Sequence, residues 1–393
     1  MKKIAFFSHI CQENAISGAE KTMFQLIQKM SEKHDCLCIF PQSGELSRQV
    51  DRLNIPTLFC RYSAVWSVKD VQGDFQMELD YIRSQGEDEA IRTMIQRLRP
   101  DYIVVNTSVN LLPAIIAKEE NIPLIWFLQE HVPHYKEQWF SLVQGVEPVI
   151  IGISESVLEP FRLRGYPDHK MHCLYPCWNE LDHNVSRSEK MHRQLRRRYQ
   201  IPHSSIVVGT ISIKVNVQKG IWHVVRAMAP LMKQNPSIHL MLRATKPINH
   251  KNAHFRKIRE YITKARLKDR VHWIPFVQNI SKVYSALDLV VVPSVLPEGF
   301  GLTALEGMGH GKPVVAYPSG GLQEIFLSTF NKPYLAEHIN PQALRKVIRP
   351  LLQSEELRQQ VGKRNQIQAI HQFGPDMYDK RYRMLEEKLA WYS

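Results

Sequence analysis

Short, almost continuously apolar segments alternate with amphipathic segments along most of this chain, and no other feature limits its fold as strongly. In the first half, the apolar segments are KIAFFSH (3–9), CLCIF (36–40), PTLFC (56–60), YIVVN (102–106), PLIWFL (123–128) and PVIIGI (148–153). Helical spacing of apolar residues predicts helices between them, over 18–30, 89–98, 111–118 and 154–162. Buried strands that alternate with helices predict a parallel sheet covered by helices on both faces.

The alternation stops at residues 183–203, which contain a basic run and no apolar strand. It resumes with the strand-like segments SIVVGTISI (205–213), HLMLRA (239–244), VHWI (271–274), LVVVP (289–293) and PVVAY (313–317). Helices are predicted over 220–232, 252–265 and 281–286, from 302 onward, and over 341–352, 355–369 and 375–390. We therefore predict two doubly wound α/β domains, residues 1–183 and 204–374, joined by a linker over 184–203. Such sheets bind ligands beyond the carboxyl ends of their strands, so the cleft between the domains is the expected site.

The stretch from Val292 to Glu324, VPSVLPEGFGLTALEGMGHGKPVVAYPSGGLQE, carries the clearest chemical signal. After a predicted strand, a loop with two glycines around Phe300 leads into a helix that begins near Leu302. Glycines let the backbone approach a ligand closely, and a helix N-terminus attracts phosphates. Glu298 lies before this helix and Glu306 lies one turn inside it, where both carboxylates can accept hydrogen bonds from vicinal sugar hydroxyls.

The pair Glu298 and Glu306, with seven residues between them, resembles the E-x7-E motif of retaining glycosyltransferases of family 4. The segments GKPVVA (311–316) and GGLQE (320–324) also resemble that family. A carboxylate in a first helical turn would explain Glu306 alone, but not the glycines around it. The resemblance covers most of the chain. It implies the GT-B fold, in which two Rossmann-like domains face a central cleft and the last helix, 375–393 here, packs back on the first domain.

The resemblance also implies roles for the residues of this motif. In the family the second acid holds the ribose of the nucleotide, which assigns Glu306 to that role. The first acid and the backbone of the glycine loop hold the donor sugar and its diphosphate. Carried over, the donor-binding residues are Glu298, Gly299, Phe300, Gly301, Leu302, Thr303 and Glu306. The implied reaction retains the anomeric configuration by front-face attack assisted by the leaving diphosphate, so Glu298 counts as catalytic without being a nucleophile.

Lys219-Gly220 ends a loop before another predicted helix and matches the Lys-Gly of the family. A cation there stabilises the charge that a departing diphosphate gains in the transition state, so Lys219 is expected to be catalytic and donor-binding. The family usually has an Arg a few residues earlier. This chain offers only Lys214, which either takes the role of that Arg or is a solvated surface charge. No Asp-x-Asp pair follows a predicted strand, so we expect no metal ion or other cofactor.

Two motifs in the first half resemble further parts of the family's site. The sequence SGAE (17–20) opens a helix and resembles the family's Gly-Gly-Ala-Glu, which makes Gly18 an expected donor-binding residue. Family members often carry His-Glu or His-Asp after the strand that matches PLIWFL, and that His reaches the donor sugar. This chain has Gln129, Glu130 and His131 instead. Either Gln129 or His131 contacts the sugar, or the site is impaired, and Glu130 is a candidate catalytic residue.

The resulting hypothesis is a glycosyltransferase that moves a sugar from a nucleoside-diphosphate sugar to a hydroxyl of a glycan or lipid-linked acceptor. Its setting would be the synthesis of cell-surface polysaccharide or glycoconjugates. Two alternatives remain open, a nucleotide-sugar 2-epimerase and a non-catalytic binding subunit with the same fold. The acceptor would lie against loops near 62–75 and 132–146, where Trp66, Trp139 and Phe140 are candidates to stack on sugar or lipid.

The charge distribution points to an anionic partner. The chain has 51 Lys and Arg against 38 Asp and Glu, a net charge of +13, with −6 in residues 1–185 and +19 in residues 186–393. The run Arg196–Arg198 is expected either on a solvated face or against anionic lipid head groups. No nucleic-acid-binding module is recognised, so nucleic acid is not an expected partner.

The location of the protein is expected to be cytoplasmic, with at most peripheral contact at the inner face of the membrane. No apolar run approaches the ~20 residues that span a bilayer. The start, MKKIAFFSHI, fits a first strand, because its apolar run is shorter than the about 7–15 residues of a signal peptide. The six cysteines are expected to be free thiols, since disulfide scaffolds are short and dense in cysteine.

Overall fold

The computed structural model describes residues 1–70, 72–133, 136–179, 188–212, 215–244, 252–277 and 279–389. The chain divides into two units. Unit 1 comprises Met1–Cys177 together with the C-terminal segment that starts at Tyr378, and unit 2 comprises Trp178–Met377. Lys214, one of the expected donor-binding residues, lies outside the described residues.

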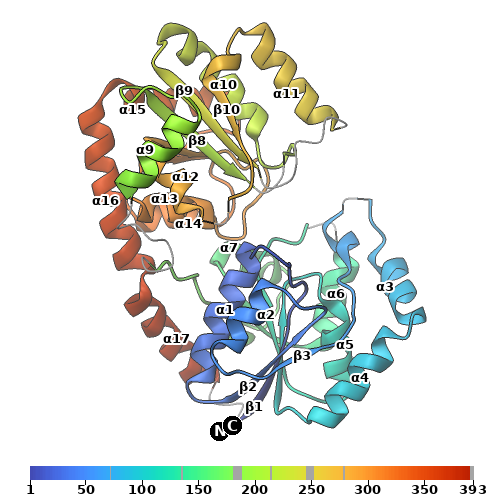
Figure 1. Cartoon of the computed structure of the whole chain (residues 1–393). Helices are drawn as coiled ribbons and strands as arrows, with labels where there is room; N and C mark the ends of the chain where they lie inside the picture. The colour runs from blue at the N-terminus through green and yellow to red at the C-terminus, as the bar shows by residue number, and fades with distance from the viewer. Residues whose placement is uncertain are drawn as a thin grey trace. The chain divides into compact units, whose positions relative to one another are not determined.

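Within its described residues, unit 1 is built on a seven-stranded sheet in the order β3-β2-β1-β4-β5-β6-β7 (Figure 1). The strands are β1 (Lys3–Phe7), β2 (Asp35–Phe40), β3 (Thr57–Phe59), β4 (Tyr102–Asn106), β5 (Leu124–Leu128), β6 (Val149–Gly152) and β7 (Met171–Cys173). All neighbouring strands are parallel, so their carboxyl ends lie along one edge of the sheet. The central strands are buried along nearly their whole length, which explains their continuous apolar sequences.

The helices of unit 1 connect these strands. They are α1 (Gly18–Ser31), α2 (Glu45–Asp51), α3 (Phe75–Ser84), α4 (Glu87–Leu98), α5 (Leu111–Glu119), α6 (Glu137–Val146) and α7 (Glu155–Arg162), with 3-10 turns at Trp66–Lys69 and Asp168–Lys170. The last helix, α17 (Pro375–Leu389), reaches unit 1 from residue 378 onward. Two ion pairs hold it there, one with α1, Lys29–Asp379 at 2.8 Å, and one with the turn after α1, Lys33–Glu386 at 2.6 Å.

Unit 2 has a parallel sheet that shows five strands among its described residues, in the order β10-β9-β8-β11-β12. They are β8 (Ile206–Ser212), β9 (Ile238–Ala244), β10 (Val271–Ile274), β11 (Leu289–Val292) and β12 (Val314–Ala316). The helices are α9 (Ser188–Arg198), α10 (Ile221–Gln234), α11 (Ala253–Lys264), α12 (Ser281–Ala286), α13 (Leu302–Gly309), α14 (Leu322–Ser328), α15 (Pro341–Gln353) and α16 (Glu355–Phe373). The core of the unit packs strand residues such as Leu240 and Val291 against apolar faces of α10 and α15. The predicted α/β class with two doubly wound parallel sheets is therefore confirmed.

The structure differs from the sequence-based expectations in the connecting segments. Residues 188–198, expected to lie in a linker, form α9 and belong to unit 2. Arg196, expected on a solvated face or at a membrane, is buried with an ion pair to Asp288 at 2.7 Å. Trp139 and Phe140, proposed to stack on a ligand, are buried against Phe161, because α6 turns its apolar face into the core.

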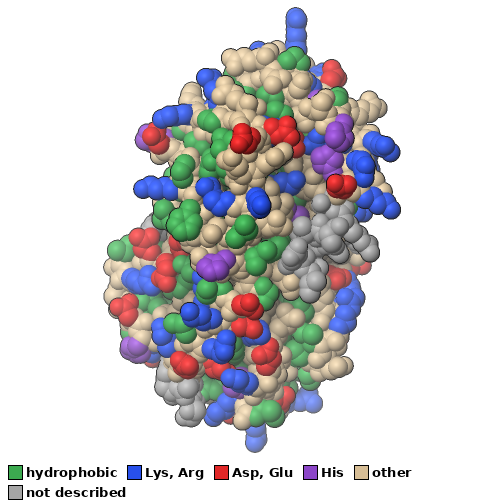
Figure 2. All heavy atoms as spheres, turned by 90° about the vertical axis from the view of Figure 1, so that its left-hand side faces the viewer, with side chains coloured by type: hydrophobic (Ala, Val, Ile, Leu, Met, Phe, Trp, Pro, Cys, Tyr) green, Lys and Arg blue, Asp and Glu red, His purple; other side chains and the backbone are tan. Residues whose placement is uncertain are grey.

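Surface charge is mixed on the face that Figure 2 shows. Lys and Arg side chains are dispersed there among Asp and Glu side chains rather than gathered in one field. Among the described helices, none combines the length and the apolar character that crossing a membrane requires.

Candidate functional site

In unit 2, charged side chains lie where the parallel strands end. Lys219 precedes α10 in the loop after β8, and Arg243 is the penultimate residue of β9. Glu298 lies in the loop after β11, and Glu306 lies inside the helix that follows, α13. This edge is where open parallel sheets bind ligands.

Lys219 and Glu298 form an ion pair, with 2.6 Å between Nζ and Oε1. The hydroxyl of Ser294 also donates a hydrogen bond to Oε1 of Glu298. The Lys219 side chain is 40% exposed and that of Glu298 is 22% exposed, so both are within reach of a ligand. The two predicted catalytic residues of this domain are thus adjacent, and they offer a cation and a carboxylate side by side.

Close backbone packing holds the two loops that carry this pair. Gly220 has a φ of +63°, and a Cβ there would lie 1.9 Å from the carbonyl oxygen of Pro293. The backbone N–H of Val295 donates to the carbonyl oxygen of Gln218 at 2.8 Å. Because only glycine fits at position 220, the loop after β8 can lie directly against the loop after β11. This contact places Lys219 beside the second loop.

In the glycine loop, Gly299–Gly301, the backbone can contact a ligand but the aromatic side chain cannot. Phe300 is 2% exposed, and its ring packs edge-on against Phe373 with 5.4 Å between centroids. Gly301 has a φ of +110°, and a Cβ there would lie 2.4 Å from the side chain of Leu322. The loop leads directly into α13, whose N-cap residue Gly301 has no side chain to accept hydrogen bonds from the first-turn N–H groups. Any donor contact of Phe300 is therefore made by its main chain.

Glu306 is held in one orientation inside α13. It is 9% exposed, and its Oε2 lies 2.9 Å from the hydroxyl of Tyr284 on α12. The Tyr284 ring stacks on His310 with 4.8 Å between centroids. Burial, the charge of Glu306 and the hydrogen bond to it raise the pKa of Tyr284 well above its usual value. Tyr284 therefore keeps its proton and remains a donor to the carboxylate.

Arg243 is a candidate site residue that the sequence reasoning missed. It is 7% exposed, and its Nε has no hydrogen-bond partner among the described residues. Its guanidinium lies 5.5 Å from the ring centroid of Phe276, and it interacts electrostatically with Tyr284 and Glu306. Burial lowers the pKa of Arg243, although an arginine still remains charged at neutral pH. The available signal was a cation at the end of the otherwise apolar strand HLMLRA.

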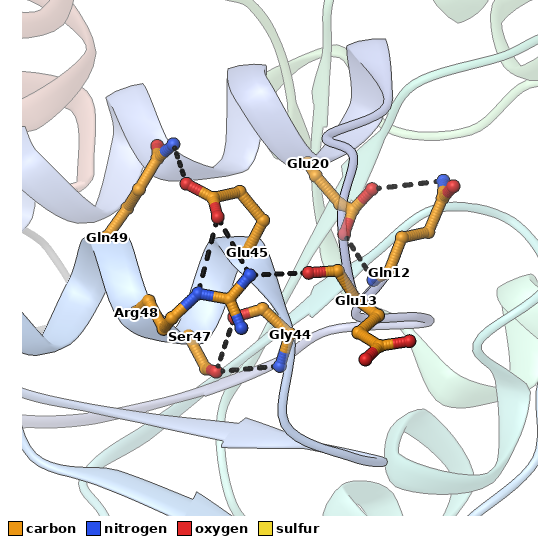
Figure 3. Close-up of polar contacts among 8 residues, drawn as sticks. All are labelled: Gln12, Glu13, Glu20, Gly44, Glu45, Ser47, Arg48 and Gln49. Atoms are coloured by element: carbon orange, nitrogen blue, oxygen red, sulfur yellow. Dashed lines mark hydrogen bonds and ion pairs between the residues drawn. The ribbon is translucent and has the colours of Figure 1, made fainter. Parts of the chain in front are cut away.

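In unit 1, Gly18 is the first residue of α1, behind the N-cap Ser17. Ser17 and Glu20 form a capping box, with 3.2 Å from the Glu20 N–H to Ser17 Oγ and 2.7 Å from the Ser17 N–H to Glu20 Oε2. Figure 3 shows that Glu20 also accepts hydrogen bonds from Gln12, and that Arg48 donates to the backbone of the same loop. The loop before Gly18 is therefore tied to both α1 and α2.

Gln129 and His131 have different surroundings within unit 1. Gln129 is 8% exposed, donates to Asn106 Oδ1 at 3.0 Å and accepts from the Thr22 hydroxyl at 2.5 Å. It thus ties the end of β5 to β4 and α1. His131 Nε2 lies 3.0 Å from the hydroxyl of Ser156 at the start of α7. That one of the two contacts the donor sugar stays a prediction.

Glu130 belongs to a separate polar cluster at the ends of β1, β4 and β5. Its Oε1 is 2.7 Å from Lys69 Nζ and 2.8 Å from Ser108 Oγ. Burial alone would raise the pKa of Glu130, but the charge and hydrogen bond of Lys69, the hydrogen bond of Ser108 and the nearby His9 outweigh it and lower the pKa. Burial lowers the pKa of His9 to about 4. At neutral pH the cluster therefore holds a carboxylate and an uncharged imidazole.

Within the described part of the chain, no group of three or more His, Cys, Asp or Glu residues is placed to hold a metal ion. The expectation that the site needs no cofactor is not tested by this and stays a prediction. None of the six cysteines, all of which lie within the described residues, takes part in a disulfide bond.

Comparison with known protein families shows the family to which the chain belongs. A family model described as glycosyltransferase family 4 matches residues 16–209, and one described as glycosyl transferases group 1 matches residues 192–368. Together they extend over both units. The chain belongs to the group 1, family 4 type of glycosyltransferases. The resemblance that we based on Glu298, Glu306 and the glycines around them is thereby confirmed at the level of the family.

Relatives of this family-4 chain match parts of it. An uncharacterised glycosyltransferase of Methanocaldococcus jannaschii is 48% identical over 73 residues, which cover 19% of this chain and 20% of the relative. The lipopolysaccharide core biosynthesis mannosyltransferase LpsB of Rhizobium meliloti is 45% identical over 69 residues, which cover 18% of this chain and 19% of LpsB. The chain thus spans about a fifth of the length of these two relatives.

A solved structure extends the likeness over the whole chain. The crystal structure of Anabaena HepE in complex with UDP and glucose is 19% identical and aligns with a TM-score of 0.76. The alignment covers 99% of this chain and 100% of HepE. This likeness confirms the predicted GT-B fold.

Proposed function

We propose that the chain is a retaining glycosyltransferase that moves a sugar from a nucleoside-diphosphate sugar to a hydroxyl of a glycan or lipid-linked acceptor. The observation that carries this proposal is the Lys219–Glu298 ion pair beside the glycine loop and the start of α13. A diphosphate is bound by a cation and helix N-terminal N–H groups, and sugar hydroxyls are bound by a carboxylate. Unit 2 offers all three together, and membership of the family supports the same activity.

A uridine nucleotide is the proposed donor carrier. HepE, which shares the fold, is described in complexes with UDP and with UDP-glucose. In this chain Glu306, oriented by Tyr284, would accept hydrogen bonds from the two ribose hydroxyls. Arg243 would add a second positive charge on the nucleotide side, beside Glu306, and so do the work that the family assigns to an arginine in the loop before Lys219.

In the proposed reaction, Lys219 and the N-terminus of α13 stabilise the charge that gathers on the diphosphate as its bond to the sugar breaks. Glu298 holds a hydroxyl of the transferred sugar. The acceptor hydroxyl attacks the anomeric carbon on the face from which the diphosphate leaves, and its proton passes to a diphosphate oxygen. No side chain acts as a nucleophile, and we expect no metal requirement. The lipopolysaccharide role in the name of LpsB supports a setting in cell-surface polysaccharide synthesis.

Titration calorimetry of the full chain with UDP and with GDP tests the donor site. We expect UDP to bind and Glu306→Gln to weaken it by roughly ten- to a hundredfold, because a carboxylate that accepts two hydroxyl hydrogen bonds is lost. Glu337→Gln is the matched control, since Glu337 is an exposed carboxylate paired with Lys346. Failure of wild type to bind either nucleotide, or equal UDP affinity in wild type and Glu306→Gln, would contradict the proposal.

A second candidate, a non-catalytic binding subunit, is favoured by one observation. Gln129 stands where the family often has a sugar-contacting His, and its side chain is engaged with Thr22 and Asn106. Such a subunit would bind UDP but would not cleave any of the donors UDP-glucose, UDP-galactose and UDP-N-acetylglucosamine to give free UDP. Release of UDP from one of these donors excludes this candidate and supports the enzyme.

A further inference from the structure

Within unit 2, the helix α16 contacts the helix α13, which follows the glycine loop (Figure 1). Gly362 of α16 lies so close to the backbone of Gly311 that a Cβ on it would be 2.1 Å from the Gly311 oxygen. Further along the helix, the buried Asn365 donates a hydrogen bond to the backbone oxygen of Lys312 at 2.8 Å. Gly311 and Lys312 follow α13 and its C-cap, so these contacts fix α16 at the C-terminal end of α13.

Phe373, the last residue of α16, lies at the other end of α13, against the glycine loop. Its ring is edge-on to Phe300 with 5.4 Å between centroids, and both side chains are buried. The flanking residues Gly299 and Gly301 have no side chains, so Phe300 supplies the only side chain that can anchor this loop in the core. The position of the loop backbone therefore depends on the surface that Phe373 presents to Phe300.

The indole of Trp178 packs against the C-terminal end of α13. It is 2% exposed, and a Cβ on Gly309 would lie 2.2 Å from one of its ring atoms. The indole is edge-on to His310, with 6.4 Å between centroids. His310 stacks on Tyr284, and Tyr284 donates the hydrogen bond that orients Glu306. Trp178 thus supports, through two rings, the side chain that we assign to the ribose.

Trp178 and Phe373 also hold each other in place. The backbone N–H of Trp178 donates to the backbone oxygen of Phe373 at 2.7 Å. Trp178 is the first residue of unit 2, and Phe373 lies near its last residue, Met377. The chain thus enters and leaves unit 2 at a joint that contacts both ends of α13. Neither residue belongs to the stretch 292–324 from which the donor site was predicted.

Fixed rings at both ends of α13 matter because the proposed donor contacts are hydrogen bonds. A hydrogen bond weakens steeply when its distance or angle leaves a narrow range. Donors that are held in place before the ligand binds need no reorganisation when charge develops on a leaving group. A close-packed aromatic ring holds the backbone in this way, since a smaller side chain would leave a cavity into which the neighbouring backbone can relax.

We propose that Phe373 and Trp178 are positioning residues of the donor site, and that they act on different parts of the nucleotide. Phe373 positions the backbone N–H groups for the diphosphate through its contact with Phe300. Trp178 positions Glu306 for the ribose through the stacked rings between them. This inference rests on the proposed function, because it assumes that the glycine loop and Glu306 bind a nucleoside diphosphate.

Phe373→Ala is tested on the full chain with UDP, titrated by calorimetry, and with uridine, measured by ligand-observed NMR. We expect UDP to bind about tenfold or more weakly than to wild type, and uridine to bind within about twofold, because uridine has no phosphate for the loop to bind. Phe373→Leu keeps most of the apolar volume and should weaken UDP about threefold. Partial unfolding would lower the fraction of the chain that binds, and would not change the ratio of the two affinities.

Trp178→Phe is tested with UDP and with 2′-deoxy-UDP, which lacks one of the two hydroxyl groups assigned to Glu306. We expect wild type to prefer UDP by about tenfold, because the deoxy nucleotide loses a hydrogen bond to a charged group. Trp178→Phe, in which the rings behind Glu306 can shift, should reduce this preference to about threefold or less. Phe373→Ala should retain the preference.

The matched control is Phe255→Ala, which removes an aromatic ring from another part of unit 2. Phe255 is 2% exposed and lies edge-on to Trp273 with 4.9 Å between centroids, much as Phe373 lies against Phe300. It belongs to α11, and not to α13, α16 or the joint between Trp178 and Phe373. We expect its affinities for UDP, uridine and 2′-deoxy-UDP to stay within about twofold of wild type.

Failure of wild type to bind either UDP or GDP contradicts the proposed function, and this inference falls with it. If GDP binds in place of UDP, guanosine and 2′-deoxy-GDP replace the uridine ligands. With a nucleotide bound, two results contradict the inference alone. One is an unchanged ratio of nucleotide to nucleoside affinity in both Phe373 variants, and the other is an unchanged preference for the ribonucleotide in Trp178→Phe. Phe373→Leu carries the first comparison if Phe373→Ala does not fold.

Discussion

Lys219 and Glu298 are 79 positions apart in the chain, and 2.6 Å separates the charged atoms of their side chains. Backbone contacts between their two loops bring them together, above all the close approach of Gly220 to Pro293. The two charges satisfy each other in this ion pair. A nucleotide diphosphate would replace Glu298 as the partner of Lys219, which would leave the carboxylate to a sugar hydroxyl.

Replacement of Lys219 by Ala tests this role. We expect Lys219→Ala to lower the rate of UDP-sugar turnover by about a hundred- to a thousandfold, because the leaving diphosphate loses the cation that stabilises its charge. Turnover is measured by UDP release at saturating donor. Lys346→Ala, which removes an exposed lysine paired with Glu337, is expected to leave the rate unchanged. A Lys219→Ala enzyme within threefold of wild type would contradict the assignment.

His9 makes the stability of the protein depend on pH. Its pKa is about 4 in the folded chain, against an ordinary value of about 6.5. Between these values the unfolded chain takes up a proton that the folded chain does not, so stability falls as pH falls from 6.5 to 4. Above 6.5 both states are neutral at this residue, and its contribution does not change with pH.

Wild type loses stability between pH 6.5 and pH 4. We expect the free energy of unfolding of His9→Gln to fall by up to about 3 kcal/mol less than that of wild type over this range. Urea unfolding at a series of pH values measures the difference. His272 has a similarly lowered pKa, so the comparison is between variants and not within wild type alone. His371, an exposed histidine on α16, provides the control. The stability of His371→Gln should follow the wild-type curve of stability against pH. Parallel curves for His9→Gln and wild type would show that His9 is not buried neutral.

Among single residues, the sequence predicts site residues that belong to a local motif. It does not predict residues that folding brings to the site from distant parts of the chain. Glu298, Glu306 and Lys219 could be predicted because their neighbours in the chain are glycines and helix starts. Arg243 and Tyr284 could not, because only the parallel register of the sheet and the packing of α12 bring them beside Glu306. The hydrogen-bond partners of Gln129 are Thr22 on α1 and Asn106 on β4, and no pattern in the sequence near Gln129 predicts them.

Among the elements, the helix α9 departs most from expectation. Its basic sequence SEKMHRQLRRR resembles a solvated linker, yet α9 packs against α12. Arg196 anchors it, with hydrogen bonds to the backbone oxygens of Ala286 and Ser205 and an ion pair to Asp288. A buried guanidinium with these partners is part of the core of unit 2.

Arg196→Ala is expected to destabilise unit 2 by about 3 kcal/mol or more, because Asp288 loses its ion pair and two buried carbonyl groups lose a hydrogen-bond donor. Thermal or urea unfolding measures the change. Arg193→Ala is the control on the same helix. Arg193 is 58% exposed and pairs with Glu189, which is 90% exposed, so its loss should cost less than about 0.5 kcal/mol. Equal stability of the two variants would contradict the anchoring role.

The strands could be predicted more fully than the connecting elements. Buried parallel strands need continuous apolar residues, and that requirement is visible in segments such as YIVVN and LVVVP. The three-residue β7 was missed because it is too short to leave a pattern, and α2, α3, α6 and α14 were missed as well. These helices are short, and packing partners such as Trp126 of β5, which contacts Trp139 of α6, are not apparent from the sequence around the helix.

For the molecule as a whole, the charge is divided unevenly between the two halves of the sequence. The part that carries +19 begins near the start of unit 2, which holds Lys219, Arg243 and the N-terminus of α13. Unit 1 holds the cluster around Glu130, in which Lys69 and Glu130 form an ion pair. The proposed reaction assigns its anionic donor to the basic unit.

A crystal structure of the full chain with bound UDP tests the central claim most directly. We predict the diphosphate within hydrogen-bond distance of Lys219 Nζ and the first-turn N–H groups of α13, and the ribose hydroxyls on Glu306. UDP bound elsewhere on the protein, or a nucleotide in unit 2 that touches neither Lys219 nor Glu306, would contradict the claim.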